Sequence, residues 1–378
     1  MAKMALDDLL VLDLSRAYAG PFCAMILADM GAKVIKIEDP KLPDYTRGLP
    51  PFGQGPRMEN SAYFAMLNRN KLGLTLNLKH PAALEIFKAL AKQADIVIEN
   101  YSAGVMKRLG LSWEELHRLN PRLILASLTC FGQDGPYAGR PGYDGMGQAM
   151  GGICSLNGYA DGPPLRVGPP IGDSVCALYA AIGILMALHS RSGTGQGQWV
   201  DVSQQDSIYS ILEAALAAYL VKSEVVTRQG SRHSYVGPYD IFPCKDGYVF
   251  YAGYLDHHWR KTCEIFGEPA LGDHPKLGSL QSRSEPANLQ GLIYPKLLEW
   301  FGRHTKQELE KMCAEEVPLC VVLDLGECTN DRQLNHRQMI QSVTHPHMGR
   351  IRVPGIVTKL SATPGRGPHG ASNSRPEH

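Results

Sequence analysis

The chain has 378 residues, of which 44% are hydrophobic and 20% charged, a composition typical of a globular protein with a substantial core. Its 38 basic and 37 acidic residues leave a formal net charge of +1, which argues against nucleic acid or an anionic membrane as a partner. The nine cysteines form no C-x-x-C pair, so neither a zinc site nor a redox dithiol is indicated. Since most of them sit in apolar segments, we expect a cytoplasmic protein with no metal and no permanently bound cofactor.

The first 130 residues alternate short apolar runs with helical segments. We expect strands at residues 9–14, 33–37, 74–78, 95–99 and 123–129, and helices at 21–30, 81–93, 103–109 and 112–119. This alternation predicts parallel βαβ units, and therefore an α/β fold whose large domain is a Rossmann-like, doubly wound sheet. Ligands bind such a sheet at the carboxyl ends of its strands, where the strand order reverses.

An apolar run from Val175 to Leu188 predicts a helix that is buried on most sides and too short to span a bilayer. It follows the sequence GPPIGDS at residues 168–174, so Asp173 lies where a loop turns into this helix. From spacing alone, an aspartate at such a position usually caps the free N–H groups of the first helical turn. The helix dipole favours the ionised form of that carboxyl group.

The pattern changes after residue 204. A second long helix is expected at 205–223, and the Asp246–Gly247 pair predicts a hairpin turn in a smaller α+β region. The composition from residue 365 onward is typical of a disordered tail. We divide the chain into a large domain at 1–204, a helical linker at 205–228, a small α+β domain at 229–325, and a return segment to the large domain with the tail at 326–378.

Six segments, in order along the chain, resemble one known family. They are VLDLSRAYAGPFCAMILADMGAKVIKIEDP at 11–40, LNRNKLGLTLNLKHP at 67–81, ADIVIENY at 94–101, SLTCFGQDGPYAGRPGYDGMGQAMGG at 127–152, GPPIGDS at 168–174 and GTGQGQWVDVS at 193–203. The sequence resembles the class III CoA-transferases, which include formyl-CoA and carnitine CoA-transferases and, as a racemase branch, α-methylacyl-CoA racemase. The resemblance implies a CoA-binding Rossmann-like domain, a small domain, and a homodimer of subunits threaded through each other as interlocked rings.

The resemblance also implies that Asp173 is the nucleophile. Its carboxylate would attack the carbonyl of an acyl-CoA, and CoA would then be held as an aspartyl thioester until an acceptor acid takes it. An unperturbed aspartate is ionised at neutral pH, so no general base is required. We expect backbone N–H groups at the start of the following helix, or on the Gly-rich loops, to stabilise the oxyanion.

Tyr143 distinguishes the branches of the family. In the racemases the matching segment reads G-H-D and its histidine acts as an acid/base, whereas this chain reads Gly142-Tyr143-Asp144. A phenol with a pKa of about 10 is a poor base at neutral pH. We therefore expect transfer of CoA between an acyl-CoA and a small carboxylic acid. An acyl-CoA racemase or isomerase and a catalytically silent CoA-binding protein remain as alternatives.

Matching the family segment by segment places the contacts to CoA at the carboxyl ends of the predicted strands. They are Tyr18, Ala19, Leu76, Asn77, Lys79, Asn100, Tyr101, Arg108 and Tyr143. Arg108 is the expected partner of a phosphate, its alternative being a solvated charge on a helix. Formyl-CoA transferase has an arginine where this chain has Asp39, so Lys36 or Arg47 is the expected replacement for that cation.

Overall fold

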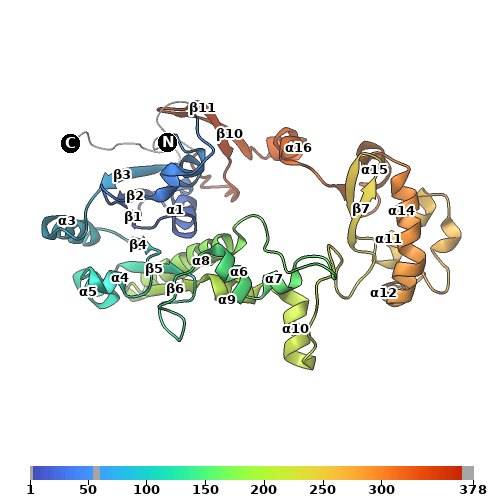
Figure 1. Cartoon of the computed structure of the whole chain (residues 1–378). Coiled ribbons are helices and arrows are strands. Elements are labelled where there is room, and N and C mark those ends of the chain that lie inside the picture. Colours follow the sequence, from blue (N-terminus) through green and yellow to red (C-terminus); the bar gives the residue numbers. More distant parts are fainter. Residues whose placement is uncertain (1–2, 54–59, 368–378) are drawn as a thin grey trace. The chain divides into compact units, whose positions relative to one another are not determined.

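The computed structural model describes residues 3–53 and 60–367 of the chain (Figure 1). The chain forms two compact units. The first comprises Met1–Ile153, Arg166–Leu212 and Asp331–His378, and the second comprises Cys154–Leu165 and Glu213–Asn330. The short segment of the second unit is joined to the later part of the chain by hydrogen bonds from the Gly230 N–H to the Gly158 carbonyl and from Arg228 to the Gly162 carbonyl. Of the expected tail, residues 368–378 lie outside the described part of the chain.

The first unit is built on a six-stranded parallel sheet with the order β3-β2-β1-β4-β5-β6. The strands, in chain order, are β1 (Leu10–Asp13), β2 (Lys33–Glu38), β3 (Lys71–Thr75), β4 (Ile96–Glu99), β5 (Ile124–Thr129) and β6 (Trp199–Ser203). Leu12 pairs with Ile35 of β2 on one side and Val97 of β4 on the other, so the order reverses at β1. The predicted α/β class with a central parallel sheet is confirmed, and ligands bind such sheets at this reversal.

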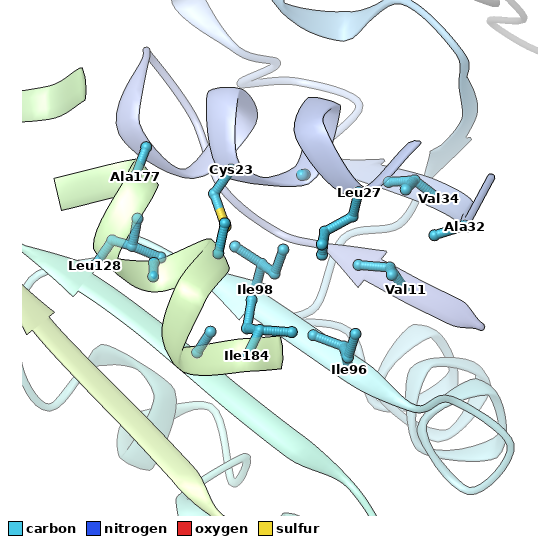
Figure 2. Close-up of a cluster of buried hydrophobic side chains, with 14 of the residues drawn as sticks. Val11, Cys23, Leu27, Ala32, Val34, Ile96, Ile98, Leu128, Ala177 and Ile184 are labelled. Atoms are coloured by element: carbon cyan, nitrogen blue, oxygen red, sulfur yellow. The ribbon is translucent and has the colours of Figure 1, made fainter. Parts of the chain in front are cut away.

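Helices cover both faces of the sheet, because successive side chains of each strand point to opposite faces. On one face, Val11 of β1 joins a buried cluster with α1 (Ala19–Asp29) and α8 (Ile171–Thr194). On the other, Leu12 joins a cluster with α3 (Pro81–Ala91) and α5 (Trp113–Leu119). Figure 2 shows the first cluster, where Cys23 and Leu27 of α1 and Ile184 of α8 lie over the same strands.

Helix α8 is longer than the apolar run suggested. It begins at Ile171 and has 24 residues, so by length and composition it could cross a membrane, and the prediction that it is too short was wrong. Its small residues, such as Ala177 and Ala180, pack on the sheet in the manner of a core helix. The opposite side is exposed in the single chain, so the prediction of burial on most sides was also wrong. This exposed stripe consists of Leu178, Tyr179, Ile182, Leu185 and Met186.

Two other elements differ from the predictions. Strand β3 begins at Lys71, three residues earlier than expected, so the expected CoA contacts at residues 76–79 follow the strand and lie in the turn before α3. The helix expected at 205–223 is divided into α9 (Gln204–Ser210) and α10 (Glu213–Lys222). Glu213, at the break, has a φ of 49°, a value that a continuous right-handed helix does not allow.

The remaining elements of the first unit lie on the loops and at the end of the chain. They are η1 (Tyr45–Gly48), α2 (Ala62–Asn68), α4 (Val105–Arg108), α6 (Asp144–Met150), α17 (Arg332–His336) and the antiparallel pair β10 (Ile340–His345) and β11 (Gly349–Pro354); α7 (Ile153–Leu156) spans the boundary between the units.

The second unit is a smaller α+β body. Its sheet is β7 (Asp240–Cys244), β8 (Gly247–Tyr251) and β9 (Leu319–Val321), all antiparallel, and the predicted hairpin at Asp246–Gly247 joins the first two strands. The helices are α10, α11 (Asp256–Ile265), η3 (Pro269–Leu271), α12 (Leu280–Ser284), α13 (Pro286–Asn288), η4 (Leu289–Ile293), α14 (Tyr294–Gly302), α15 (Lys306–Cys313) and α16 (Leu325–Asn330). Trp259 and Phe301 are fully buried in its core.

Candidate active site

The loops after β1 and β4 are joined at the reversal of the strand order. The amide of Asn100 makes two hydrogen bonds to Arg16, accepting from its N–H at 2.8 Å and donating to its carbonyl at 2.7 Å. The next residue, Ala17, has a φ of 66° and donates its N–H to Asp44 at 3.2 Å. This arrangement fixes the turn from which Tyr18 leads into α1.

Buried ion pairs support this edge of the sheet. Lys36 lies 3.1 Å from Asp44, and Arg47 makes two hydrogen bonds to Glu38, at 3.0 and 2.7 Å. All four side chains are buried and the two cations are paired with carboxylates. Neither Lys36 nor Arg47 therefore presents a free charge to a phosphate. The prediction that Lys36 or Arg47 replaces the missing arginine is therefore not supported by the geometry.

The first turn of α8 is capped by Asp144 and not by Asp173. Oδ1 of Asp144 accepts hydrogen bonds from the N–H groups of Gly172, at 2.8 Å, and of Asp173, at 3.3 Å. The Ile171 N–H donates to Pro169 and the Ser174 N–H to Pro170, so the N–H groups of residues 171–174 all have partners. The cap interpretation of Asp173 is therefore wrong, and the N–H groups expected to form an oxyanion hole at this helix start are already engaged.

The carboxyl group of Asp173 is placed where α6, α8 and α9 meet. Nε2 of Gln204 donates to Oδ1 of Asp173 at 2.6 Å, and among the described residues Oδ2 accepts no hydrogen bond. Burial, and to a smaller extent the nearby Asp144 carboxylate, raise the pKa of Asp173, and the hydrogen bond from Gln204 lowers it; the net result is a pKa of about 7. The expectation of an unperturbed aspartate was wrong, because desolvation disfavours the charged form.

Tyrosine side chains surround this carboxyl group. Ser174 donates from Oγ to the Tyr18 hydroxyl at 3.4 Å, and the rings of Tyr18 and Tyr63 lie 6.3 Å apart. Burial raises the pKa values of Tyr63 and Tyr45, and the charge of Asp173 adds to both shifts. The ring of Tyr143 is 66% exposed, at the start of α6. The structure thus places the Tyr18 hydroxyl beside Ser174, the neighbour of Asp173, and adds Tyr45 and Tyr63 to the residues near its carboxyl group.

The other predicted CoA contacts lie at the same carboxyl edge of the sheet. Ala19 begins α1. Tyr101 follows β4, with the Arg16 guanidinium 5.9 Å from its ring centre. Asn77 accepts from the Lys79 N–H at 3.1 Å in the turn after β3, where Leu76 packs on the apolar cluster of that face. Arg108 ends α4, with an exposed side chain.

Sequence reasoning missed Gln204, Asp144, Tyr45 and Tyr63. The two tyrosines lie in and just after a Pro- and Gly-rich loop that carries no periodic pattern. The sequence did contain a signal for Gln204. It is a polar residue at the start of a helix, directly after strand β6, whose last residue is buried. Among the described residues, no group of three or more His, Cys, Asp or Glu side chains could hold a metal ion.

Comparison with known proteins agrees with this geometry. The model of CoA-transferase family III matches residues 6–373. The chain belongs to this family. It is 37% identical over 363 residues to a succinyl-CoA–D-citramalate CoA-transferase of Chloroflexus aurantiacus, covering 95% of this chain and 89% of that protein. It is 33% identical to a formyl-CoA:oxalate CoA-transferase of Rhodopseudomonas palustris strain HaA2, covering 95% and 88%.

Solved structures agree with these sequence relatives. A CaiB/BaiF family protein from Brucella suis superposes with a TM-score of 0.84 at 30% identity, covering 96% of this chain and 94% of that one. A hypothetical protein from Mycobacterium tuberculosis has the same TM-score at 26% identity, covering 98% of each chain. The protein is thus a class III CoA-transferase, and its substrates are CoA thioesters.

The raised pKa of Asp173 makes the stability of this CoA-transferase depend on pH. The unfolded chain releases this proton near pH 3.8, but the folded chain keeps it until about pH 7. The contribution of Asp173 to the free energy of unfolding therefore falls as the pH rises from about 4 to 7. We expect Asp173→Asn, which has no charge to bury, to be more stable than the wild type at pH 8 by roughly 1–3 kcal/mol, with the gain vanishing toward pH 4.

Urea unfolding at several pH values between 4 and 8 measures this difference. The control is Asp134→Asn, which removes an exposed carboxylate from the loop after β5. A gain for Asp173→Asn that does not change with pH, or a loss of stability at pH 8, would contradict the prediction.

Proposed function

We propose that this enzyme transfers CoA from an acyl-CoA to a carboxylic acid through a covalent aspartyl-CoA thioester on Asp173. The observation that carries the proposal is the state of this carboxyl group. Asp144 satisfies the N–H groups of the helix, so Asp173 has no capping role, and its Oδ2 accepts no hydrogen bond from the described residues. A desolvated carboxylate with one free oxygen is suited to nucleophilic attack.

The proposed reaction has four steps. Oδ2 of ionised Asp173 attacks the thioester carbonyl of the donor, which forms a mixed anhydride and expels CoA thiolate. The thiolate attacks Cγ of Asp173, which forms the aspartyl thioester and releases the donor acid. The acceptor carboxylate attacks the same carbon and expels the thiolate, which finally attacks the acceptor's acyl carbon and frees Asp173. The steps exchange acyl groups of similar reactivity, so positioning supplies most of the rate.

The relatives suggest the class of substrate. Their names pair succinyl-CoA with D-citramalate or mesaconate, and formyl-CoA with oxalate. We propose that the donor and the acceptor are small acids of this kind, at least one of them dicarboxylic. The nine free cysteines support a cytoplasmic location for the enzyme.

We further propose that CoA lies along the carboxyl edge of the sheet, between the turn after β1 and helix α4. The residues proposed to contact it are Tyr18, Ala19, Leu76, Asn77, Lys79, Asn100, Tyr101, Arg108 and Tyr143. Support comes from their position at the reversal of the strand order, where nucleotides bind doubly wound sheets. Among the described residues the Arg108 guanidinium, at the end of α4, has no hydrogen-bond or ion-pair partner and is suited to a phosphate, whereas Lys36 and Arg47 are paired inside the protein.

A homodimer, with its rings interlocked as in the family, is the proposed assembly. The exposed stripe of α8 presents large apolar side chains to solvent in the single chain. In the second unit, α10 likewise exposes Tyr219, Leu220 and Val221. Contiguous apolar surface of this kind marks a protein interface.

The covalent intermediate is the decisive prediction. Incubation with a donor acyl-CoA and no acceptor should attach CoA to Asp173, and hydroxylamine should convert that residue to the hydroxamate. Mass spectrometry of the peptide that contains residue 173 detects both products. Asp173→Asn should retain CoA binding and lose transfer, because it cannot form the anhydride.

Three results would overturn this mechanism. The first is transfer at a comparable rate by Asp173→Asn in a sample shown by mass spectrometry to be free of deamidation. The second is wash-in of deuterium at the α-carbon of the acyl-CoA without any acceptor acid and without a covalent adduct, which would indicate a racemase. The third is CoA binding without exchange of acyl groups, which would indicate a catalytically silent protein.

Arg108→Ala should weaken CoA binding by about 1.5–3 kcal/mol, the scale of a hydrogen bond to a charged group. Calorimetry with CoA and with dephospho-CoA measures the loss and identifies the phosphate, since a partner of the 3′-phosphate matters less for dephospho-CoA. Lys107→Ala, an adjacent exposed cation on the same helix, is the control. Equal affinity of Arg108→Ala and the wild type for both ligands would remove Arg108 from the site.

The dimer should persist at low micromolar concentration in sedimentation velocity, because an interface of this apolar character does not dissociate before the subunits unfold. Leu185→Glu, in the exposed stripe of α8, should disrupt it, and Ser190→Glu, at an exposed polar position on the same helix, should not. A folded wild-type monomer under these conditions would refute the assembly.

A further inference from the structure

Gln204 contacts the carboxyl group on which the proposed chemistry takes place. It is the first residue of α9, directly after β6, and its side chain is buried with 7% exposed. Its Nε2 donates to Oδ1 of Asp173 at 2.6 Å, a short hydrogen bond of the kind made to a charged group. The role of the amide therefore depends on what happens to Oδ1 during turnover.

The side chain of Gln204 packs closely against Gly147 of α6. A Cβ atom on Gly147 would lie 2.6 Å from Cβ of Gln204 and 2.8 Å from its Oε1, so only glycine leaves room for the amide. Oε1 is buried and has no hydrogen-bond partner among the described residues. Burying an acceptor without a partner lowers stability. Gln204 thus leaves Oε1 without a partner, which lowers stability, while its Nε2 donates to Asp173.

The helix start offers no competing donor to that carboxyl group. The N–H groups of Gly172 and Asp173 donate to Asp144, and the Ser174 N–H donates to Pro170. Among the described residues, the amide of Gln204 is thus the group that donates a hydrogen bond to Oδ1 of Asp173.

We propose that Gln204 is a further catalytic residue, whose Nε2–H stabilises the oxyanion that forms on Oδ1 when Cγ of Asp173 is attacked. The inference rests on the proposed function, because only a covalent aspartyl intermediate makes Cγ electrophilic.

The chemistry at Cγ gives the hydrogen bond its catalytic value. In the mixed anhydride, Oδ2 bridges to the donor acyl group and Oδ1 is the carbonyl oxygen. The thiolate sulfur bonds to Cγ, the electron pair of the C=O bond moves to Oδ1, and the bond from Cγ to Oδ2 then breaks as the donor carboxylate leaves with that oxygen. Discharge by the acceptor carboxylate forms the same oxyanion. A hydrogen bond that strengthens as charge develops on Oδ1 lowers the barrier to both steps.

The test compares wild type, Gln204→Met and Gln205→Met. Methionine keeps the length of the glutamine side chain without its donor, and Gln205, whose amide donates to the Met150 carbonyl, is the matched control. Rapid quenching after mixing with donor acyl-CoA, followed by mass spectrometry, gives the rates at which the aspartyl thioester forms and at which acceptor acid discharges it. We expect Gln204→Met to slow both rates by about 100-fold, the lower end of the loss when one oxyanion donor is removed. Gln205→Met should match the wild type.

Two readouts separate this role from a structural one. Infrared spectra of the thioester, with the Asp173 carbonyl labelled with carbon-13, should show a higher C=O stretching frequency in Gln204→Met, because the hydrogen bond to Oδ1 is gone. At low pH the rate falls because Asp173 is protonated, and losing this hydrogen bond raises the pKa of Asp173, which moves that fall to higher pH. The rates should therefore also be measured on the plateau at higher pH, where Asp173 is ionised in both proteins. A loss that persists on the plateau supports the proposal.

The outcomes are distinguishable. A wild-type adduct with unchanged rates in Gln204→Met overturns the inference and leaves the proposed function standing. Full recovery of the variant on the plateau also overturns it, since Gln204 would then only tune the ionisation of Asp173. No adduct in the wild type overturns the proposed function and the inference together.

Discussion

The hydrogen bonds from the first turn of α8 to Asp144 determine what Asp173 can do. A helix start leaves N–H groups that need partners, and a carboxylate in the first turn is usually drawn toward them. Here Oδ1 of Asp144 takes that place, from a different helix, and Asp173 is left with one hydrogen bond from Gln204. The Asp144 side chain thus fills the capping role that Asp173 would otherwise have, and its charge also helps to raise the pKa of Asp173.

A raised pKa has two opposing effects on a nucleophile. It makes the carboxylate more basic once it is ionised, but it reduces the fraction ionised near neutral pH. The hydrogen bond from Gln204 moderates the shift, because it favours the charged form. Glu99, at the end of β4, also has its pKa raised to about 7 by burial. Both of its oxygens accept hydrogen bonds, from Gln133 and from the Tyr101 N–H, so it lacks the free oxygen that Asp173 has.

Buried charges near the carboxyl end of β1 are paired within the protein. Lys71 is fully surrounded, with Nζ 2.9 Å from Asp13, from the Pro21 carbonyl and from Asn68, and burial lowers its pKa to about 8. Removing one member of a buried pair leaves an uncompensated charge, so such residues are constrained by their partners. This explains why cations near the expected phosphate site can be unavailable to CoA.

The sequence by itself determined the α/β class with its central parallel sheet and the family to which the chain belongs. Apolar runs of strand length separated by helical segments predict a parallel sheet because hydrophobic periodicity is a local property. The segments around GPPIGDS and GYDGMGQ were enough to identify the family and to single out Asp173 and Tyr143. What the sequence could not supply was the partner of each polar group, since a carboxylate before an apolar run is equally compatible with a cap and with a nucleophile.

Only the tertiary structure excluded the capping role of Asp173. Asp144 and Gln204 are 29 and 31 residues from Asp173 along the chain, and packing of α6 and α9 against α8 brings them within hydrogen-bonding distance. The same holds for the pKa of Asp173, which depends on burial and on a neighbouring charge and therefore on the folded state. It holds also for the cations, because pairing with Asp44 and Glu38 is what makes Lys36 and Arg47 unavailable. Periodicity and spacing report which residues are near in sequence, whereas desolvation and hydrogen bonding depend on which are near in space.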